Sequence, residues 1–175
     1  MRYVELRRHS HRNGLDEHLS QRGVDLARRV GRGRGAFHVV LTSRAVRTYE
    51  TAVAMGFAVT GEYESVPLTA EHYKMLDGLI PENATFPDRA RVLQTHALGR
   101  PFADGLRKQW EKLARSLPEG GAALVVTHGG LIDNSAVACL PTADHSHWGP
   151  SLGHCEGVRL AYDEAGGCSG ELLRV

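Results

Sequence analysis

The feature that most constrains the fold is an arrangement that occurs three times: a short apolar run ends in polar residues and is followed by a helical pattern. Continuous apolar runs of this length are typical of strands buried on both faces. Residues 39–41 and 122–126 are continuously apolar, and residues 3–6 are apolar except for Glu5. The three segments lead into Arg7-Arg8-His9, Thr42-Ser43-Arg44 and Thr127-His128-Gly129. Strands that alternate with helices in this way predict an α/β fold, a three-layer sandwich with a mostly parallel central sheet.

The helices between these strands are predicted from their caps and periodicity. Ser20 is expected to cap a helix that closes near residues 31–35, and Arg47 lies on the helix after the second strand. The clearest helix spans residues 102–117, and another follows His128. Two final strands are expected at residues 158–162 and 171–175, and a short edge strand at residues 65–68.

Composition limits the class of protein. A chain of 175 residues with 42% hydrophobic content predicts one domain over residues 1–175. A net charge of +1, with lysine and arginine spread along the chain, gives no reason to expect nucleic acid as a partner. Neither a membrane-length apolar run nor a signal peptide is expected. Three cysteines without a Cys-x-x-Cys pair predict reduced thiols and a cytoplasmic protein.

The polar ends of the three runs predict an anion site. In parallel sheets, ligands bind at the carboxyl ends of the strands, so three segments are expected to bring Arg and His to one edge. Guanidinium groups match phosphate oxygens, and a neutral histidine can attack phosphorus. Arginines beside His9 would repel a metal cation, and no His-x-x-x-His pair lies on a predicted helix with an acidic partner. No metal or cofactor is therefore expected.

Four segments, in the same order, resemble the histidine phosphatase superfamily, also called phosphoglycerate mutase-like. They are Leu6-Arg7-Arg8-His9-Ser10, Leu19-Ser20-Gln21-Arg22-Gly23-Val24-Asp25-Leu26-Ala27, the stretch from Ser43 through Arg47 to Thr51-Ala52, and Val125-Val126-Thr127-His128-Gly129-Gly130. The resemblance implies that His9 is the nucleophile and that Arg8, Arg47 and His128 form a phosphate pocket.

Two further residues are expected on the substrate side of this pocket. Ser10 stands where the family has a glycine, and Asn13 stands two positions before the place of a family asparagine, which is Leu15 here. His11 and His154 are further candidates for the neighbourhood of the phosphate.

A carboxylic acid is expected to protonate the leaving group. Many family members carry a glutamate for this purpose after the second arginine, and Leu68-Thr69-Ala70-Glu71-His72-Tyr73 resembles that segment. Glu71 is therefore the predicted proton donor and Asp77 the second choice, with Glu64 and Glu82 also in this stretch.

The resemblance implies a metal-independent phosphatase that acts on a small phosphomonoester, a phosphorylated metabolite, through a phosphohistidine intermediate. A mutase is less expected because family mutases carry longer insertions. Two alternatives stay open. A protein phosphohistidine phosphatase needs no acid, because imidazole is already a good leaving group. A non-catalytic module that binds a phosphorylated ligand would fit the Ser10 and Leu15 departures.

Overall fold

The computed structural model describes residues 1–63, 70–81 and 84–175, and this part of the chain contains a mixed six-stranded sheet. The strand order is β3-β2-β4-β1-β5-β6. The strands β1, β2, β3 and β4 run parallel, and β5 and β6 are antiparallel to their neighbours. Their bounds are β1 Arg2–Arg8, β2 Val39–Thr42, β3 Gly61–Glu62, β4 Ala122–Thr127, β5 Gly157–Tyr162 and β6 Cys168–Leu173.

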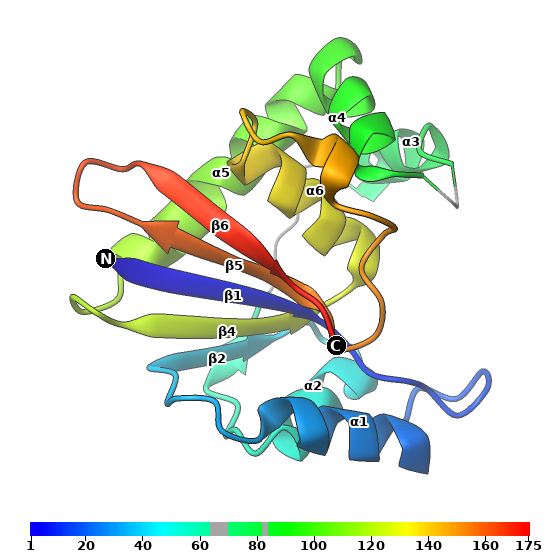
Figure 1. The fold of residues 1–175 in the computed structure, drawn as a ribbon. Coiled ribbons are helices and arrows are strands. Elements are labelled where there is room, and N and C mark those ends of the chain that lie inside the picture. The colour runs from blue at the N-terminus through cyan, green and yellow to red at the C-terminus, as the bar shows by residue number, and fades with distance from the viewer. Residues whose placement is uncertain (64–69, 82–83) are drawn as a thin grey trace.

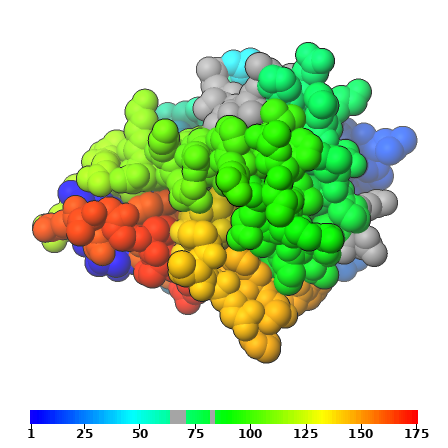
Figure 2. Space-filling view, turned by 90° about the horizontal axis from the view of Figure 1, so that it is seen from above, coloured from blue at the N-terminus to red at the C-terminus, as the bar shows by residue number. Residues whose placement is uncertain are grey.

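Helices cover both faces of this sheet (Figure 1). On one face lie α1 (Gln21–Gly31) and α2 (Val46–Ala54). The other face carries α4 (Phe86–Thr95), α5 (Gly99–Arg115) and α6 (Gly129–Cys139), with α3 (Ala70–Gly78) beside them and the 3₁₀ helix η1 at His145–His147. Figure 2 views the molecule from the side of this second layer, where the helices hide most of the sheet. The predicted α/β sandwich with a mostly parallel sheet is confirmed.

The central strands divide the core by the alternation of their side chains. On β1, Val4 and Leu6 pack into the larger core beneath α5 and α6. On β4, Leu124 and Val126 pack into a smaller core beneath α1 and α2. Successive side chains of a strand point to opposite faces, so each central strand is buried on both sides, as its apolar run indicates.

Two elements begin three residues before their predicted starts. The helix expected at residues 102–117 begins at Gly99, because Pro101 is tolerated in a first turn, where its missing N–H has no helical partner. The last strand begins at Cys168 rather than residue 171, because the Asp163 side chain accepts a hydrogen bond from Gly167 N (2.7 Å) and closes a tight turn. The edge strand expected at residues 65–68 lies outside the described residues.

Helix α4 has a sequence signal that the periodicity analysis missed. Thr85 and Asp88 form a capping box, in which the Thr85 hydroxyl accepts from Asp88 N and the Asp88 carboxylate accepts from Thr85 N. Pro87 lies in the same first turn. A Thr-x-x-Asp segment with proline in the first turn is a recognised helix start.

The register of the parallel strands brings the three polar segments together. Arg8 of β1 is paired with Thr127 of β4, and Thr42 of β2 with Val126. The backbone of His9 donates to Thr127 O (2.9 Å), and that of Ser43 to Val126 O (3.1 Å). All three strands therefore end at the same edge of the sheet.

Candidate active site

Four basic side chains gather where β1, β2 and β4 end, and they are called the Arg–His cluster below: Arg8, His9, Arg47 and His128. The ring centroids of His9 and His128 are 5.5 Å apart. Arg8 and Arg47 lie close enough to lower the pKa of both histidines. The structure thus brings together the four residues predicted to bind and attack a phosphoryl group.

His9 is held in one orientation. Its Nδ1 lies 2.8 Å from the Ser10 carbonyl oxygen, which can only accept a hydrogen bond. Nδ1 must then carry the proton, so Nε2 has a free lone pair. Burial lowers the pKa of His9 to about 4, with the hydrogen bond to Ser10 acting in the opposite direction and His128, Arg47 and Arg8 adding to the decrease. At neutral pH, His9 is therefore a neutral imidazole, the form that can act as a nucleophile.

This lowered pKa predicts a pH-dependent stability. The unfolded chain takes up a proton on His9 below about pH 6.5, while the folded chain resists it until about pH 4, so stability is lost as pH falls through this window. Allowing for solvent at the site, the loss is about 2 kcal/mol. The free energy of unfolding of the parent and of His9→Asn can be measured with urea at pH 8 and at pH 4. Between these pH values the parent should lose this amount of stability relative to His9→Asn. An unchanged difference would contradict the assigned protonation state.

Each arginine of the cluster has one buried donor without a partner among the described residues. Arg8 donates from Nη1 to the Leu152 carbonyl (2.7 Å), and Arg47 pairs through Nη1 with the Glu17 carboxylate. The Nε atoms of Arg8 and Arg47 are buried and have no hydrogen-bond partner among the described residues. Buried donors of this kind require a partner, and phosphoryl oxygens match them.

His128 is oriented by β2 and α2. Its Nε2 lies 3.1 Å from the Ser43 hydroxyl, which is 3.0 Å from the Thr48 hydroxyl. Burial lowers the pKa of His128, Arg47 and Arg8 lower it further, and Glu17 opposes them. His128 is therefore a neutral ring beside the nucleophile that can donate a hydrogen bond.

Gly129, directly after His128, leaves room for Arg8. A Cβ atom at this position would lie 3.1 Å from Arg8 Cδ and Nε. The His-Gly segment after β4 is thus explained by the close passage of the Arg8 side chain.

Comparison with known proteins identifies the family of this chain. The model of the histidine phosphatase superfamily (branch 1) matches residues 5–172. The chain belongs to the histidine phosphatase superfamily. No curated protein matches its sequence.

Solved structures of this superfamily share the fold at low sequence identity. A phosphoglycerate mutase from Bacillus anthracis str. Sterne is 15% identical with a TM-score of 0.62, covering 98% of this chain and 92% of its own. A mycobacterial glucosyl-3-phosphoglycerate phosphatase is 19% identical with a TM-score of 0.62 and full coverage of both chains. A phosphoserine phosphatase from Entamoeba histolytica is 16% identical with a TM-score of 0.61, covering 100% of this chain and 98% of its own.

Ser10, at the position of the superfamily glycine, supports the nucleophile. Its hydroxyl donates to Gly23 O (2.7 Å) and its backbone N–H to the Thr51 hydroxyl (2.9 Å), while its carbonyl accepts from His9. The positive-φ residues do not include Ser10, so a side chain is tolerated there. Direct contact of Ser10 with a substrate stays a prediction.

Asn13 and Glu71 are both exposed side chains. Asn13 is exposed on the loop after the nucleophile, and its backbone N–H donates to His18 O (3.1 Å). Glu71 is exposed in the first turn of α3, and no contact within the described part of the chain joins it to the Arg–His cluster. Asp77 is also exposed on α3, and Glu64 and Glu82 lie outside the described residues. The roles of Asn13 and Glu71 stay predictions.

Two further histidines, His11 and His154, lie near His9. The His154 ring is 5.7 Å from His9 and 3.9 Å from His11, between centroids. The pKa of His154 is lowered to about 4, mainly by burial. The nearby Arg8, His11, Arg22 and Arg12 lower it further. Cys155 next to it has φ +60° and is held through its N–H to Arg8 O (3.1 Å). Sequence reasoning named both histidines as candidates without a motif that would place them.

Glu17 is the site residue that sequence reasoning missed. It belongs to no motif of the superfamily segments quoted above, and its contact with Arg47 joins a loop to a helix far along the chain. Only the path of that loop brings a carboxylate to the cluster.

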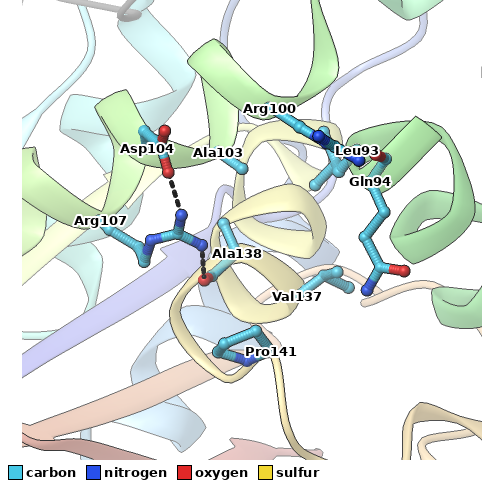
Figure 3. Close-up of a pocket in the computed structure, with 9 residues that line it drawn as sticks. All are labelled: Leu93, Gln94, Arg100, Ala103, Asp104, Arg107, Val137, Ala138 and Pro141. Atoms are coloured by element: carbon cyan, nitrogen blue, oxygen red, sulfur yellow. Dashed lines mark hydrogen bonds and ion pairs between the residues drawn. The ribbon is translucent and has the colours of Figure 1, made fainter. Parts of the chain in front are cut away.

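A separate hollow of about 410 Å³ lies between α4, α5 and α6 (Figure 3). Its Arg107 side chain pairs with Asp104 and donates to the Ala138 carbonyl (3.0 Å). The Arg107 guanidinium group is therefore already bonded, unlike the Nε donors of the Arg–His cluster.

The described residues contain neither a grouped metal site nor a membrane-spanning helix. Within residues 1–63, 70–81 and 84–175, no three or more His, Cys, Asp or Glu side chains are grouped to hold a metal ion. In the same ranges no helix is long and apolar enough to cross a membrane.

Proposed function

We propose that this protein is a metal-independent phosphatase that hydrolyses a small phosphomonoester through a phosphohistidine formed on His9. The observation that carries the proposal is the state of His9: a buried, neutral imidazole whose Nδ1–H is bound to Ser10 O, with Nε2 free beside two arginines. A nucleophile must be unprotonated, and a phosphoryl group needs positive charge around its oxygens.

The reaction follows from these positions. Arg8 and Arg47 bind the phosphoryl oxygens through their free Nε donors, and His128 donates to the same group as its charge grows. Nε2 of His9 attacks phosphorus as the bond to the leaving oxygen breaks, and an acid protonates that oxygen. Water then attacks the phosphohistidine and releases phosphate. The sequence prediction assigns the acid to Glu71.

The comparisons support a phosphatase in coarser terms. Structures named for a glucosyl-3-phosphoglycerate phosphatase and a phosphoserine phosphatase share the fold, and so does a mutase. We propose a small phosphorylated metabolite as substrate and hydrolysis rather than phosphoryl transfer between hydroxyls. A cytoplasmic location is proposed from Cys139, Cys155 and Cys168, which are all free thiols.

A second function is favoured by one observation. Glu71, the predicted acid, is exposed and without a described contact to the cluster. A protein phosphohistidine substrate needs no such acid, because the leaving imidazole is stable once released. We therefore keep protein phosphohistidine phosphatase as the alternative.

The test is phosphate release from p-nitrophenyl phosphate, a panel of phosphorylated metabolites and a phosphohistidine peptide, between pH 5 and 8 with a chelator present. Turnover of one or more metabolites above the peptide is the expected result. Turnover of the peptide alone would favour the alternative. Thermal stabilisation by inorganic phosphate without any turnover would replace both with a binding module. Activity that the chelator abolishes would contradict the metal-independent mechanism.

A further inference from the structure

The loop after the nucleophile is a short, internally bonded hairpin of residues 11–20, called the nucleophile hairpin below. Arg12 and Leu19 form an isolated β-bridge. Backbone N–H groups donate from Asn13 to His18 O (3.1 Å) and from Ser20 to His11 O (3.0 Å). These bonds close the hairpin on itself and define where its tip residues lie.

Helix α2 holds the nucleophile hairpin against the Arg–His cluster. The Glu50 carboxylate accepts from Leu19 N (2.7 Å) and pairs with His18 Nδ1 (2.6 Å). Glu50 lies one turn after Arg47 on α2, so the two side chains share a face of the helix. The helix that supplies Arg47 to the phosphate site therefore also fixes the hairpin that carries Glu17.

Glu17 is thereby placed at the phosphoryl site. Its carboxylate pairs with Arg47 Nη1, and it is close enough to His128 to oppose the decrease in the pKa of that ring. Arg47 keeps its Nε free among the described residues, so it can bind a phosphoryl oxygen while Nη1 retains Glu17. The Glu17 side chain is 54% exposed, so solvent can supply and remove its proton.

We propose that Glu17 is the acid that protonates the leaving oxygen of the substrate. This inference rests on the proposed phosphatase function and gives the acid role to a residue other than Glu71. Glu17 combines the two properties the role requires: contact with a group that binds the phosphoryl oxygens, and access to water. Glu71 is also accessible to water, but no contact among the described residues joins it to a group that binds the phosphoryl oxygens.

The proton balance of the two steps is simple. In the proposed cycle, Glu17 carries one proton when the substrate binds. As the His9 Nε2–P bond forms and the P–O bond breaks, the Glu17 proton passes to the leaving alkoxide, which departs as an alcohol. In the second step, the Glu17 carboxylate takes a proton from the water that attacks the phosphohistidine. Glu17 is then protonated for the next cycle.

The leaving group distinguishes this role from a general weakening of the site. Glycerol 3-phosphate releases a basic alkoxide that needs a proton, whereas p-nitrophenyl phosphate releases a stable phenolate that does not. For Glu17→Gln, we expect kcat for glycerol 3-phosphate to fall by about 100-fold or more, and kcat for p-nitrophenyl phosphate by less than about threefold. Asp16→Asn, on the same hairpin, is the matched control, expected to stay within about threefold of the parent on both esters.

Each other outcome overturns part of the scheme. An equal loss on both esters would mean that Glu17 supports the site without donating a proton. A gain on both esters, with tighter inorganic phosphate binding, would make Glu17 a competitor for Arg47. A leaving-group-dependent loss in Glu71→Gln, with Glu17→Gln unaffected, would return the acid role to Glu71. These three results leave the phosphatase intact. A parent that hydrolyses neither ester, or full activity in His9→Ala, would refute the proposed function itself.

Discussion

Replacement of His9 by alanine is expected to lower phosphate release from p-nitrophenyl phosphate by about 1,000-fold or more, since a covalent mechanism has no route without its nucleophile. The geometry gives the reason. His9 alone in the cluster combines a fixed Nδ1–H with a free Nε2 beside Arg8 and Arg47. Neither His128 nor His154 can replace it, because their rings are centred 5.5 and 5.7 Å away.

The measurement is steady-state phosphate release with a chelator present, together with acid and alkali quenching of the working enzyme. A phosphohistidine survives alkali and is lost in acid, so phosphate should remain on the parent only after the alkaline quench. His147→Asn is the matched control, because His147 is exposed on η1 and paired only with Asp144 among the described residues. Retention of more than a tenth of the parent activity in His9→Ala would exclude His9 as the nucleophile.

The second large effect concerns stability, and it arises from a buried carboxylate. Substitution of Glu5 by glutamine is expected to reduce the free energy of unfolding by about 3–5 kcal/mol. Glu5 and Arg7 are both almost fully buried on β1, with Arg7 Nε 2.7 Å from Glu5 Oε1. Arg34 and Arg159 reach the same carboxylate at 3.0 and 2.8 Å. Removal of the single negative charge leaves Arg7 buried without a counter-ion.

The pH dependence of this group has a defined sign. Burial acts to raise the pKa of Glu5, but Arg7, Arg159 and Arg34 outweigh it and hold the pKa below its usual value. The stabilisation is therefore present above about pH 4.5 and is lost as pH falls further through the lowered value.

Urea unfolding at pH 7 of the parent, Glu5→Gln and Glu171→Gln tests the predicted loss of stability. Glu171 pairs with Arg159 on the surface, and its substitution should cost less than about 1 kcal/mol. A similar cost for both substitutions would contradict the central role of Glu5.

The Glu5–Arg7 pair also connects stability to the site. Arg7 Nη1 donates to the Cys155 carbonyl (2.8 Å), and Cys155 follows His154. The buried ion pair thus supports the loop that holds a histidine beside the nucleophile. The sequence motifs assign no such role to Glu5 or Arg7, and Arg7 appears in them only as the residue before Arg8.

Much of the fold follows from local pattern. The apolar runs of β2 and β4 predict strands buried on both faces, because a strand with one face in water alternates apolar and polar residues. On β1 the apolar residues are interrupted by Glu5, and only the structure shows that its carboxylate is buried beside Arg7. The helices in the middle of the chain are not predicted by local pattern. Helix α3 has a weak amphipathic pattern, and α4 is signalled by its Thr85–Asp88 capping box rather than by periodicity.

By itself, the sequence determined the class of fold and which strand ends meet, because both depend on the order of the strands along the chain. Arg47, on helix α2, was predicted only from the resemblance to the superfamily. The carboxyl ends of parallel strands must meet at one edge, so Arg8, His9 and His128 were predictable neighbours. Only the tertiary structure decided the protonation of His9, the approach of His154, and the pairing of Glu17 with Arg47. These properties arise from burial and from contacts between distant segments, which no local pattern encodes.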